Sequence, residues 1–136
     1  MGAAGVPKAQ RARLRLSEFQ LERAASGIES LHRRHYGAAT GCADAQQSDT
    51  LLTVVLRSVL TRDERFLMDI GRADLVAGFH SAFHKSMRPQ FVAAVERAIG
   101  VEVRAVDTSV DVEHDLTIER FFLGEADAER RFVRAA

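Results

Sequence analysis

Cysteine and tryptophan are the residues this chain most lacks: its 136 residues include a single cysteine, Cys42, and no tryptophan. One thiol excludes an internal disulfide, and it excludes a zinc site made from several cysteines of one chain. The start of the chain also lacks the apolar core of a secretory signal. Together these absences predict a protein of a reducing compartment, the cytoplasm.

An excess of charge of either sign is lacking as well. The 19 lysine and arginine residues balance 19 aspartate and glutamate residues, which gives a formal net charge of +0. No overall field therefore favours nucleic acid, and no apolar run approaches the roughly 20 residues of a membrane span. We expect no membrane insertion. Basic side chains before and within the first helix leave weak nucleic-acid binding as an alternative, but no aromatic residues are interleaved with them.

The length and composition, with 46% hydrophobic and 28% charged residues, are typical of one globular domain. We expect three segments along the chain. Residues 1–14 form a flexible basic arm, residues 15–124 form the single domain, and residues 125–136 form a short charged tail.

The first helix is predicted to begin at Ser17, whose hydroxyl forms a capping box with the Gln20 side chain. It is predicted to end at Tyr36-Gly37, where the glycine supplies a positive φ. Residues at three- and four-residue spacing predict one stripe that faces either the core or a second subunit: Leu21, Ala24, Ile28, Leu31 and His35.

The strands are predicted from runs and alternations of apolar residues. A short edge strand over 42–46 precedes a strand over 51–60, which is apolar on both faces and therefore central or covered on both sides. A switch in the alternation predicts a bulge near Ala105 in the third strand. A turn at 113–115 then leads to a last strand over 116–123.

Two helical stretches lie between these strand pairs. The capping box of Thr61 and Glu64 begins the first, which Gly71 interrupts. Pro89, in the middle of the second, predicts a bend or a break. Apolar residues predicted to face the core are Phe66, Leu67 and Ile70 in the first, and Leu75, Phe79, Phe83, Met87, Phe91, Val95 and Ile99 in the second.

This order of elements, α-β-β-α-α-β-β, predicts an α+β fold. We expect a mainly antiparallel sheet of about four strands with the helices packed on one face.

His80 and His84 are the main candidates for metal chemistry, because a spacing of four on a helix places two imidazoles on one face. A third ligand would have to come from the first helix, from His32 or His35. The sequence HSAFH lacks the glutamate of the HExxH metalloprotease motif. Because the ligand set is incomplete, we expect no resident metal or cofactor and a boundary position for these rings. A histidine-based metal or haem protein is the alternative.

No set of residues predicts an enzyme. Cys42 lies among small residues without a neighbouring histidine. Asp107, Asp111 and Asp115 lack the glycine and the bidentate glutamate of a calcium loop. A glycine-rich phosphate-binding loop is also absent from the sequence. We therefore expect no catalytic residues.

Phe121 and Phe122 are adjacent on the last predicted strand and so point to opposite faces of the sheet. One enters the core, and the other is exposed unless a second copy of the chain or another protein covers it. This pattern predicts a homodimer, with a different protein partner as the second possibility.

A family resemblance extends over residues 17–124. It is carried by Tyr36-Gly37, LLTVVLRSVLTRDE (51–64), Gly71-Arg72 with Leu75-Val76, Phe83 with Met87-Arg88-Pro89, Val95-Glu96 through Ile99-Gly100-Val101, and the strand pair to Phe122-Leu123. The chain resembles the MpsC-like family, a domain of unknown biochemical function labelled as part of a sodium-translocating, membrane-potential-generating system. It departs from the usual family pattern in AATGCADAQQ after Gly37, at Arg57-Ser58 and at His84.

The resemblance implies an accessory or regulatory domain linked to ion or inorganic-carbon transport systems. It supplies no catalytic residues. Together with the apolar strand surface, it leads us to expect a non-enzymatic, self-associating accessory protein.

Overall fold

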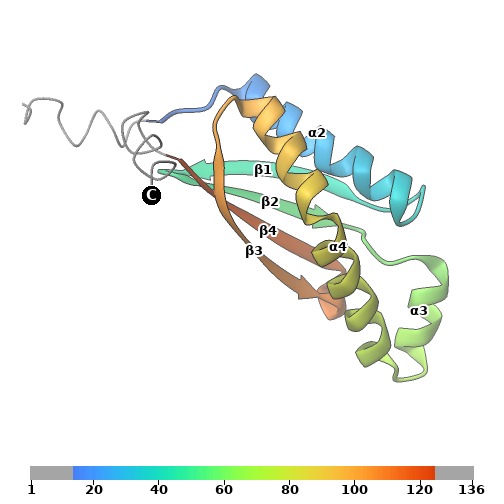
Figure 1. Cartoon of the computed structure of the whole chain (residues 1–136). Coiled ribbons are helices and arrows are strands. Elements are labelled where there is room, and N and C mark those ends of the chain that lie inside the picture. Colours follow the sequence, from blue (N-terminus) through green and yellow to red (C-terminus); the bar gives the residue numbers. More distant parts are fainter. Residues whose placement is uncertain (1–13, 125–136) are drawn as a thin grey trace, which may run out of the picture.

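The computed structural model describes residues 14–124, in which helices pack on one face of a four-stranded antiparallel sheet (Figure 1). The elements in chain order are α2 (Glu18–His35), β1 (Cys42–Ser48), β2 (Leu51–Arg57), α3 (Arg62–Asp69), α4 (Ala73–Ile99), β3 (Val103–Asp111), a 3₁₀ turn η1 (Val112–His114) and β4 (Leu116–Leu123). The predicted α+β class and element order are confirmed. The predicted tail, and all but the last residue of the predicted arm, lie outside the described residues.

The strand order in the sheet is β1-β2-β4-β3, so the last strand of the chain lies between the second and the third. All neighbouring strands are antiparallel. β2 is therefore an interior strand, as its apolar sequence predicted. The side chains of β2 and β4 that face the helices are buried: Leu52, Val54, Leu56, Thr117, Glu119, Phe121 and Leu123.

The helix α2 begins at the predicted capping box, in which Ser17 Oγ accepts from the Gln20 N–H at 3.1 Å and Gln20 Oε1 accepts from the Ser17 N–H at 2.8 Å. Its end differs from the prediction. Gly37 has no positive φ. The chain after it forms a turn in which the Thr40 N–H donates to the Gly37 carbonyl at 3.0 Å, and the left-handed residue of this connection is Gly41, at φ +89°. The buried residues of α2 are Ala24, Ala25, Ile28 and His32.

The helix α4 runs without interruption through Pro89, so of the predicted bend or break the break is excluded. Pro89 has no N–H to donate to the Lys85 carbonyl, which therefore lacks its helical hydrogen bond. Both residues are exposed, so water can bind this carbonyl instead. The predicted core stripe is also wrong in the first half of α4, where Leu75 and Phe79 are 37% and 51% exposed. A four-residue step advances by about 40° beyond a helical turn, so residues spaced by four wind gradually around the helix. The stripe faces the core at Phe91, Val95 and Ile99 and has turned toward solvent at Leu75 and Phe79.

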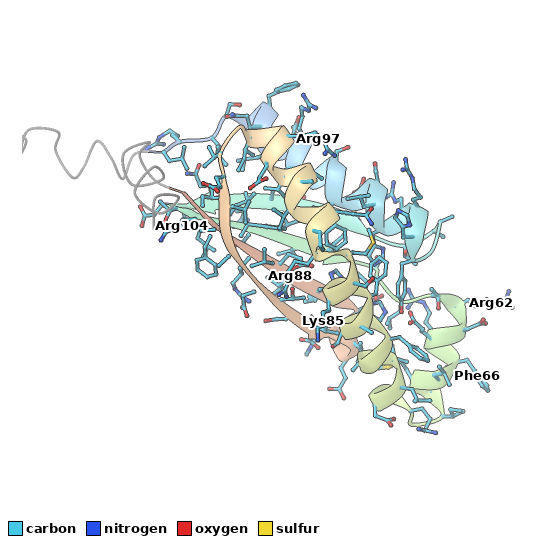
Figure 2. The ribbon with its side chains drawn as sticks, in the orientation of Figure 1. Arg62, Phe66, Lys85, Arg88, Arg97 and Arg104 are labelled. Atoms are coloured by element: carbon cyan, nitrogen blue, oxygen red, sulfur yellow. The ribbon has the colours of Figure 1, made fainter. Side chains whose placement is uncertain are left out.

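The helix α3 packs beside the first half of α4 and buries Glu64 as its innermost residue. Of the apolar face predicted for α3, Leu67 is partly buried and packs against the core, whereas the other two residues point outward. Phe66 is 62% exposed and projects outward from the helix (Figure 2), and Ile70 is 55% exposed. The capping box between Thr61 and Glu64 begins α3 as predicted, with both of its hydrogen bonds present.

The closing strand pair follows the predicted pattern. The register of β3 against β4 shifts between Val103 and Ala105, as a bulge near Ala105 requires. The connection is the 3₁₀ turn η1, after which Asp115 takes a left-handed conformation at φ +57°. Between Leu14 and Gly124, no helix combines the length and the apolar character that crossing a membrane requires.

We predict that Pro89→Ala stabilises the protein. Alanine restores a backbone donor to the Lys85 carbonyl and is the best helix former, so the free energy of unfolding should rise by about 1–3 kcal/mol. Urea unfolding followed by circular dichroism measures this change. Gln90→Ala, at the next exposed position of α4, is the control and should change stability by less than about 0.5 kcal/mol. A loss of stability in Pro89→Ala would contradict the prediction.

Candidate metal centre

The structure brings three of the four candidate histidines together in the layer between α2, α4 and the sheet. His32 lies in the last turn of α2, and His80 and His84 lie one turn apart on α4. All three side chains are buried, whereas His35 is exposed. The predicted boundary position of the α4 pair is therefore wrong, because the rotation of α4 that exposes Leu75 and Phe79 turns these imidazoles inward.

Each histidine has one ring nitrogen held by a neighbouring polar group. Nδ1 of His32 lies 2.9 Å from Oγ1 of Thr40, and that hydroxyl donates its single hydrogen to the Gly37 carbonyl at 2.6 Å. The Thr40 oxygen must therefore accept from Nδ1–H of His32. In this tautomer Nε2 of His32 carries no hydrogen and exposes its lone pair.

Glu64 holds His80. Its Oε1 lies 3.0 Å from Nε2 of His80 and also accepts the Thr61 N–H, while its Oε2 accepts the hydroxyl of Tyr36. The capping carboxylate of α3 is thus also the acceptor that orients a ring on α4. Because an ionised carboxylate only accepts, Nε2 of His80 is the protonated nitrogen and Nδ1 carries the free lone pair.

Glu119 of β4 holds His84 in the same way. Its Oε2 is hydrogen-bonded to Nδ1 of His84, and its Oε1 accepts the Thr108 hydroxyl at 2.6 Å. Nδ1–H of His84 is then the donor, and Nε2 carries the free lone pair. Metal-binding histidines are typically oriented by carboxylates and other acceptors in this manner.

The three free nitrogens are buried without a partner. Among the described residues, four buried side-chain nitrogen or oxygen atoms lack a hydrogen bond, and three of them are Nε2 of His32, Nδ1 of His80 and Nε2 of His84. The three rings bring one nitrogen each to within 4.8 Å of the others. None of the free nitrogens carries a hydrogen, so they cannot satisfy one another. A cation that accepts three lone pairs would satisfy all of them.

Aromatic rings enclose this cluster. Tyr36 lies 4.4 Å from His80 between ring centroids, and Phe83 lies edge-on to His32 at 5.4 Å. Phe91 closes the side of His84 at 5.5 Å. An apolar shell of this kind keeps solvent away from a site and strengthens the electrostatic interactions inside it.

The pKa directions agree with neutral imidazoles. Burial, followed by the proximity of His84 and His80, lowers the pKa of His32 from 6.5 to about 4. Burial also lowers the pKa of His80, although the hydrogen bond to Glu64 acts in the opposite direction. Both rings are therefore neutral near pH 7 and can offer a lone pair.

Burial would raise the pKa of Glu64, but hydrogen bonds from Tyr36, from the Thr61 N–H and from His80 outweigh it and hold the pKa below its usual value. The Tyr36 pKa is raised by burial and by the same carboxylate. Glu64 is consequently an anion inside the core, and it is hydrogen-bonded to the neutral imidazole of His80.

The other candidates remain apart from this cluster. Cys42 is exposed on β1, and Asp107 is paired with Arg120 on the sheet surface. A groove of about 250 Å³ between α2 and β1 carries several glutamates, but no histidine of the cluster lines it. Two of its acids, Glu29 and Asp44, are paired with arginines.

The sequence interpretation missed the groups that orient the rings. Glu119 shares its strand parity with Phe121 and Thr117, so assigning Phe121 to the core would have placed this carboxylate inside too. Gly41 was also missed: a Cβ at this position would lie 3.0 Å from Nδ1 of His32. Only glycine lets the chain pass this close to the ring at φ +89°.

The fold and the cluster together define a small α+β domain whose core contains three oriented histidines. Comparison with family models matches residues 17–125 to the family described as Na+-translocating membrane potential-generating system (MpsC). This match covers most of the chain, which belongs to the MpsC family, as the resemblance predicted. Comparisons with curated proteins and with solved structures gave no match.

The pKa of His32 predicts how the stability of the metal-free protein depends on pH. Its value is about 4 in the folded chain and 6.5 unperturbed, so the unfolded chain binds more protons between these values. The stability is complete above pH 6.5 and falls as the pH drops toward 4, by about 2–3 kcal/mol from this group. Denaturant unfolding of chelator-treated protein at several pH values measures the loss.

His32→Gln is the control for this measurement, because carboxylates that titrate in the same range act on both proteins alike. The variant should lose less stability than the wild type over the same pH range. The same pH dependence in both proteins would show that His32 does not titrate there.

Proposed function

We propose that this domain binds one divalent transition-metal ion through His32, His80 and His84. The observation that carries the proposal is the set of three buried imidazole nitrogens that have no hydrogen and no partner, each fixed by a second group on the far side of its ring. One nitrogen of each ring lies within 4.8 Å of a nitrogen of the other two, whereas ligands about 2.0 Å from a tetrahedral zinc ion are about 3.3 Å apart. Loading therefore draws the rings together by small side-chain shifts.

The charge of the site supports a divalent ion. Two buried carboxylates, Glu64 and Glu119, lie behind neutral rings, and a 2+ ion at the centre balances them inside the core. Imidazole donors suit zinc, cobalt, nickel and copper, whereas magnesium and calcium take oxygen ligands. We propose zinc, with a structural role, because the three ligands are buried in an aromatic shell.

The metal proposal predicts one zinc ion per chain in protein purified without a histidine tag. His84→Gln removes a ligand and should weaken zinc binding by more than about 100-fold, and Glu119→Gln should weaken it by about 10–100-fold. Isothermal titration of chelator-treated protein measures both affinities, and cobalt(II) absorbance reports tetrahedral coordination. Zinc at about 100 times its Kd should add about 2.7 kcal/mol to the free energy of unfolding.

His35→Gln is the matched control, since His35 lies three residues beyond His32 on α2 and is exposed. This variant should bind zinc like the wild type. Wild-type protein that takes up no metal, and whose stability is unchanged by zinc, would overturn the proposal. Binding that survives His84→Gln but is lost in His35→Gln would place the site elsewhere.

We further propose that the domain self-associates and acts as a non-enzymatic accessory component in the cytoplasm, linked to ion or inorganic-carbon transport. The transport link is supported by the family description alone. Self-association is supported by Phe122, which is 42% exposed on the sheet face opposite the helices while its neighbour Phe121 is buried, as the adjacent pair predicted.

Self-association through the sheet predicts that Phe122→Asp produces a monomer, because a carboxylate in an apolar interface loses its hydration without a partner. Phe66→Asp is the control, since Phe66 is also exposed but lies on α3 (Figure 2). Sedimentation velocity over a range of concentrations distinguishes the two. Dissociation of Phe66→Asp with an intact Phe122→Asp dimer would move the interface to the helices.

A further inference from the structure

The sheet face that points away from the helices has most of its apolar side chains on the two interior strands and a polar margin on the edge strands. The interior strands contribute five apolar side chains, all of them at least partly exposed: Leu51 and Val55 from β2, and Leu116, Ile118 and Phe122 from β4. Thr53, Arg57 and Arg120 are their polar side chains on this face. The two edge strands contribute only small or polar side chains: Cys42, Asp44, Gln46 and Ser48 from β1, and Ala105, Asp107, Ser109 and Asp111 from β3. An apolar patch rimmed by polar groups is typical of a protein interface.

The register of the strands gives this face four rows of side chains. In the strand order β1, β2, β4, β3, the first inner row is Asp44, Val55, Ile118 and Ser109. The second inner row is Gln46, Thr53, Arg120 and Asp107. In the same order, the outer row beside the first is Cys42, Arg57, Leu116 and Asp111. The outer row beside the second is Ser48, Leu51, Phe122 and Ala105. Each row therefore has its own sequence of side chains from β1 to β3. In a dimer through this face, the side chains of one copy have to be compatible with those opposite them in the other copy.

A two-fold axis that runs parallel to the strands, between β2 and β4, matches the face to itself. It places each side chain of β2 opposite the side chain of β4 in the same row of the other copy. Val55 then meets Ile118, and Leu51 meets Phe122. Aligned sheets pack in this way, with their strands within about 30° of one another and about 10 Å apart.

The charged residues also find suitable partners around this axis. Arg120 faces Thr53, Asp107 faces Gln46 and Asp44 faces Ser109, so no two like charges meet. Arg57 faces Leu116, where the aliphatic part of the arginine can pack and its guanidinium can stay with Asp44 of its own chain.

A two-fold axis perpendicular to the strands gives a poorer match. It places Ile118 opposite Arg120 and Leu51 opposite Arg57, which doubles the contacts between apolar side chains and guanidinium groups. It keeps only one kind of apolar contact, Leu116 opposite Phe122, where the parallel axis has two. It also places Val55 opposite Thr53. The self-complementary pattern therefore selects the axis parallel to the strands.

We propose that two copies of this chain pack their open sheet faces together about a two-fold axis parallel to the strands, with β2 of each copy over β4 of the other. The inference rests on the proposed self-association and is independent of the metal site. Four strands about 4.8 Å apart and about seven residues long give a flat area on the order of 450 Å² per copy, or about 900 Å² in both copies together, which is the size of a weak interface. We therefore expect a dimer with a Kd on the order of micromolar.

Charge exchange at facing positions tests the arrangement. Val55→Glu and Ile118→Lys each place a charge opposite an apolar side chain, and each alone should weaken dimerisation by at least about tenfold. In an equimolar mixture, a heterodimer pairs the new glutamate with the new lysine at one contact and keeps the native Val55–Ile118 contact at the other. Sedimentation velocity should then show the dimer restored in the mixture alone.

Ala105→Lys is the matched control for simple charge attraction. Ala105 lies on β3 in the row of Phe122, away from Val55, so mixing this variant with Val55→Glu should leave Val55→Glu monomeric. Circular dichroism establishes that each variant is folded. If either central variant unfolds, Leu51→Glu with Phe122→Lys is the equivalent pair, because these residues also face each other about the proposed axis.

The outcomes distinguish self-association itself from the proposed two-fold arrangement. Wild-type protein that stays monomeric at several hundred micromolar overturns self-association and the arrangement together. A wild-type dimer with single variants that dissociate, but without rescue in the mixture, overturns the arrangement and leaves self-association through this face. Rescue in the mixture that is absent from the Ala105→Lys control supports the proposed axis.

Discussion

Two carboxylates buried between the sheet and α4 impose the main electrostatic constraint on this fold. Glu64 and Glu119 are each held by a histidine and by a hydroxyl, from Tyr36 and Thr108 respectively. An unbalanced charge in a core of this size would cost several kcal/mol. The neutral imidazoles satisfy the hydrogen bonds of the carboxylates but not their charge. The divalent ion that we propose on the inner side of the rings would complete the balance, and it would link α2 to α4.

Much of the fold could be predicted from the sequence because its signals are local. The capping box at Thr61, the bulge near Ala105 and the opposite faces of Phe121 and Phe122 each depend on a few neighbouring residues. The candidate site could be predicted only in part. The spacing of His80 and His84 was visible, but their inward direction depends on the rotation of α4 along its length, which follows from packing rather than from local sequence.

One side chain in the site has both a local and a long-range role. The Glu64 carboxylate caps α3 and orients His80 at the same time, and only the first of these roles has a sequence pattern. The orienting groups of His32 lie in the irregular connection around Thr40, where sequence patterns are weakest. The histidines and their orienting groups consequently come from α2, the connection after it, α3, α4 and β4, and they are spread over the sequence from His32 to Glu119.

The position of β4 between β2 and β3 has a consequence for synthesis of the protein. The β1–β2 hairpin emerges from the ribosome early, but the strand that pairs with the inner edge of β2 follows only after residues 58–115. Closing so long a loop is slow compared with local folding. During that interval an apolar strand edge, rich in leucine and valine, is open to pairing with other chains. Protection of the nascent hairpin is therefore a requirement of this topology, independent of the stability of the finished domain.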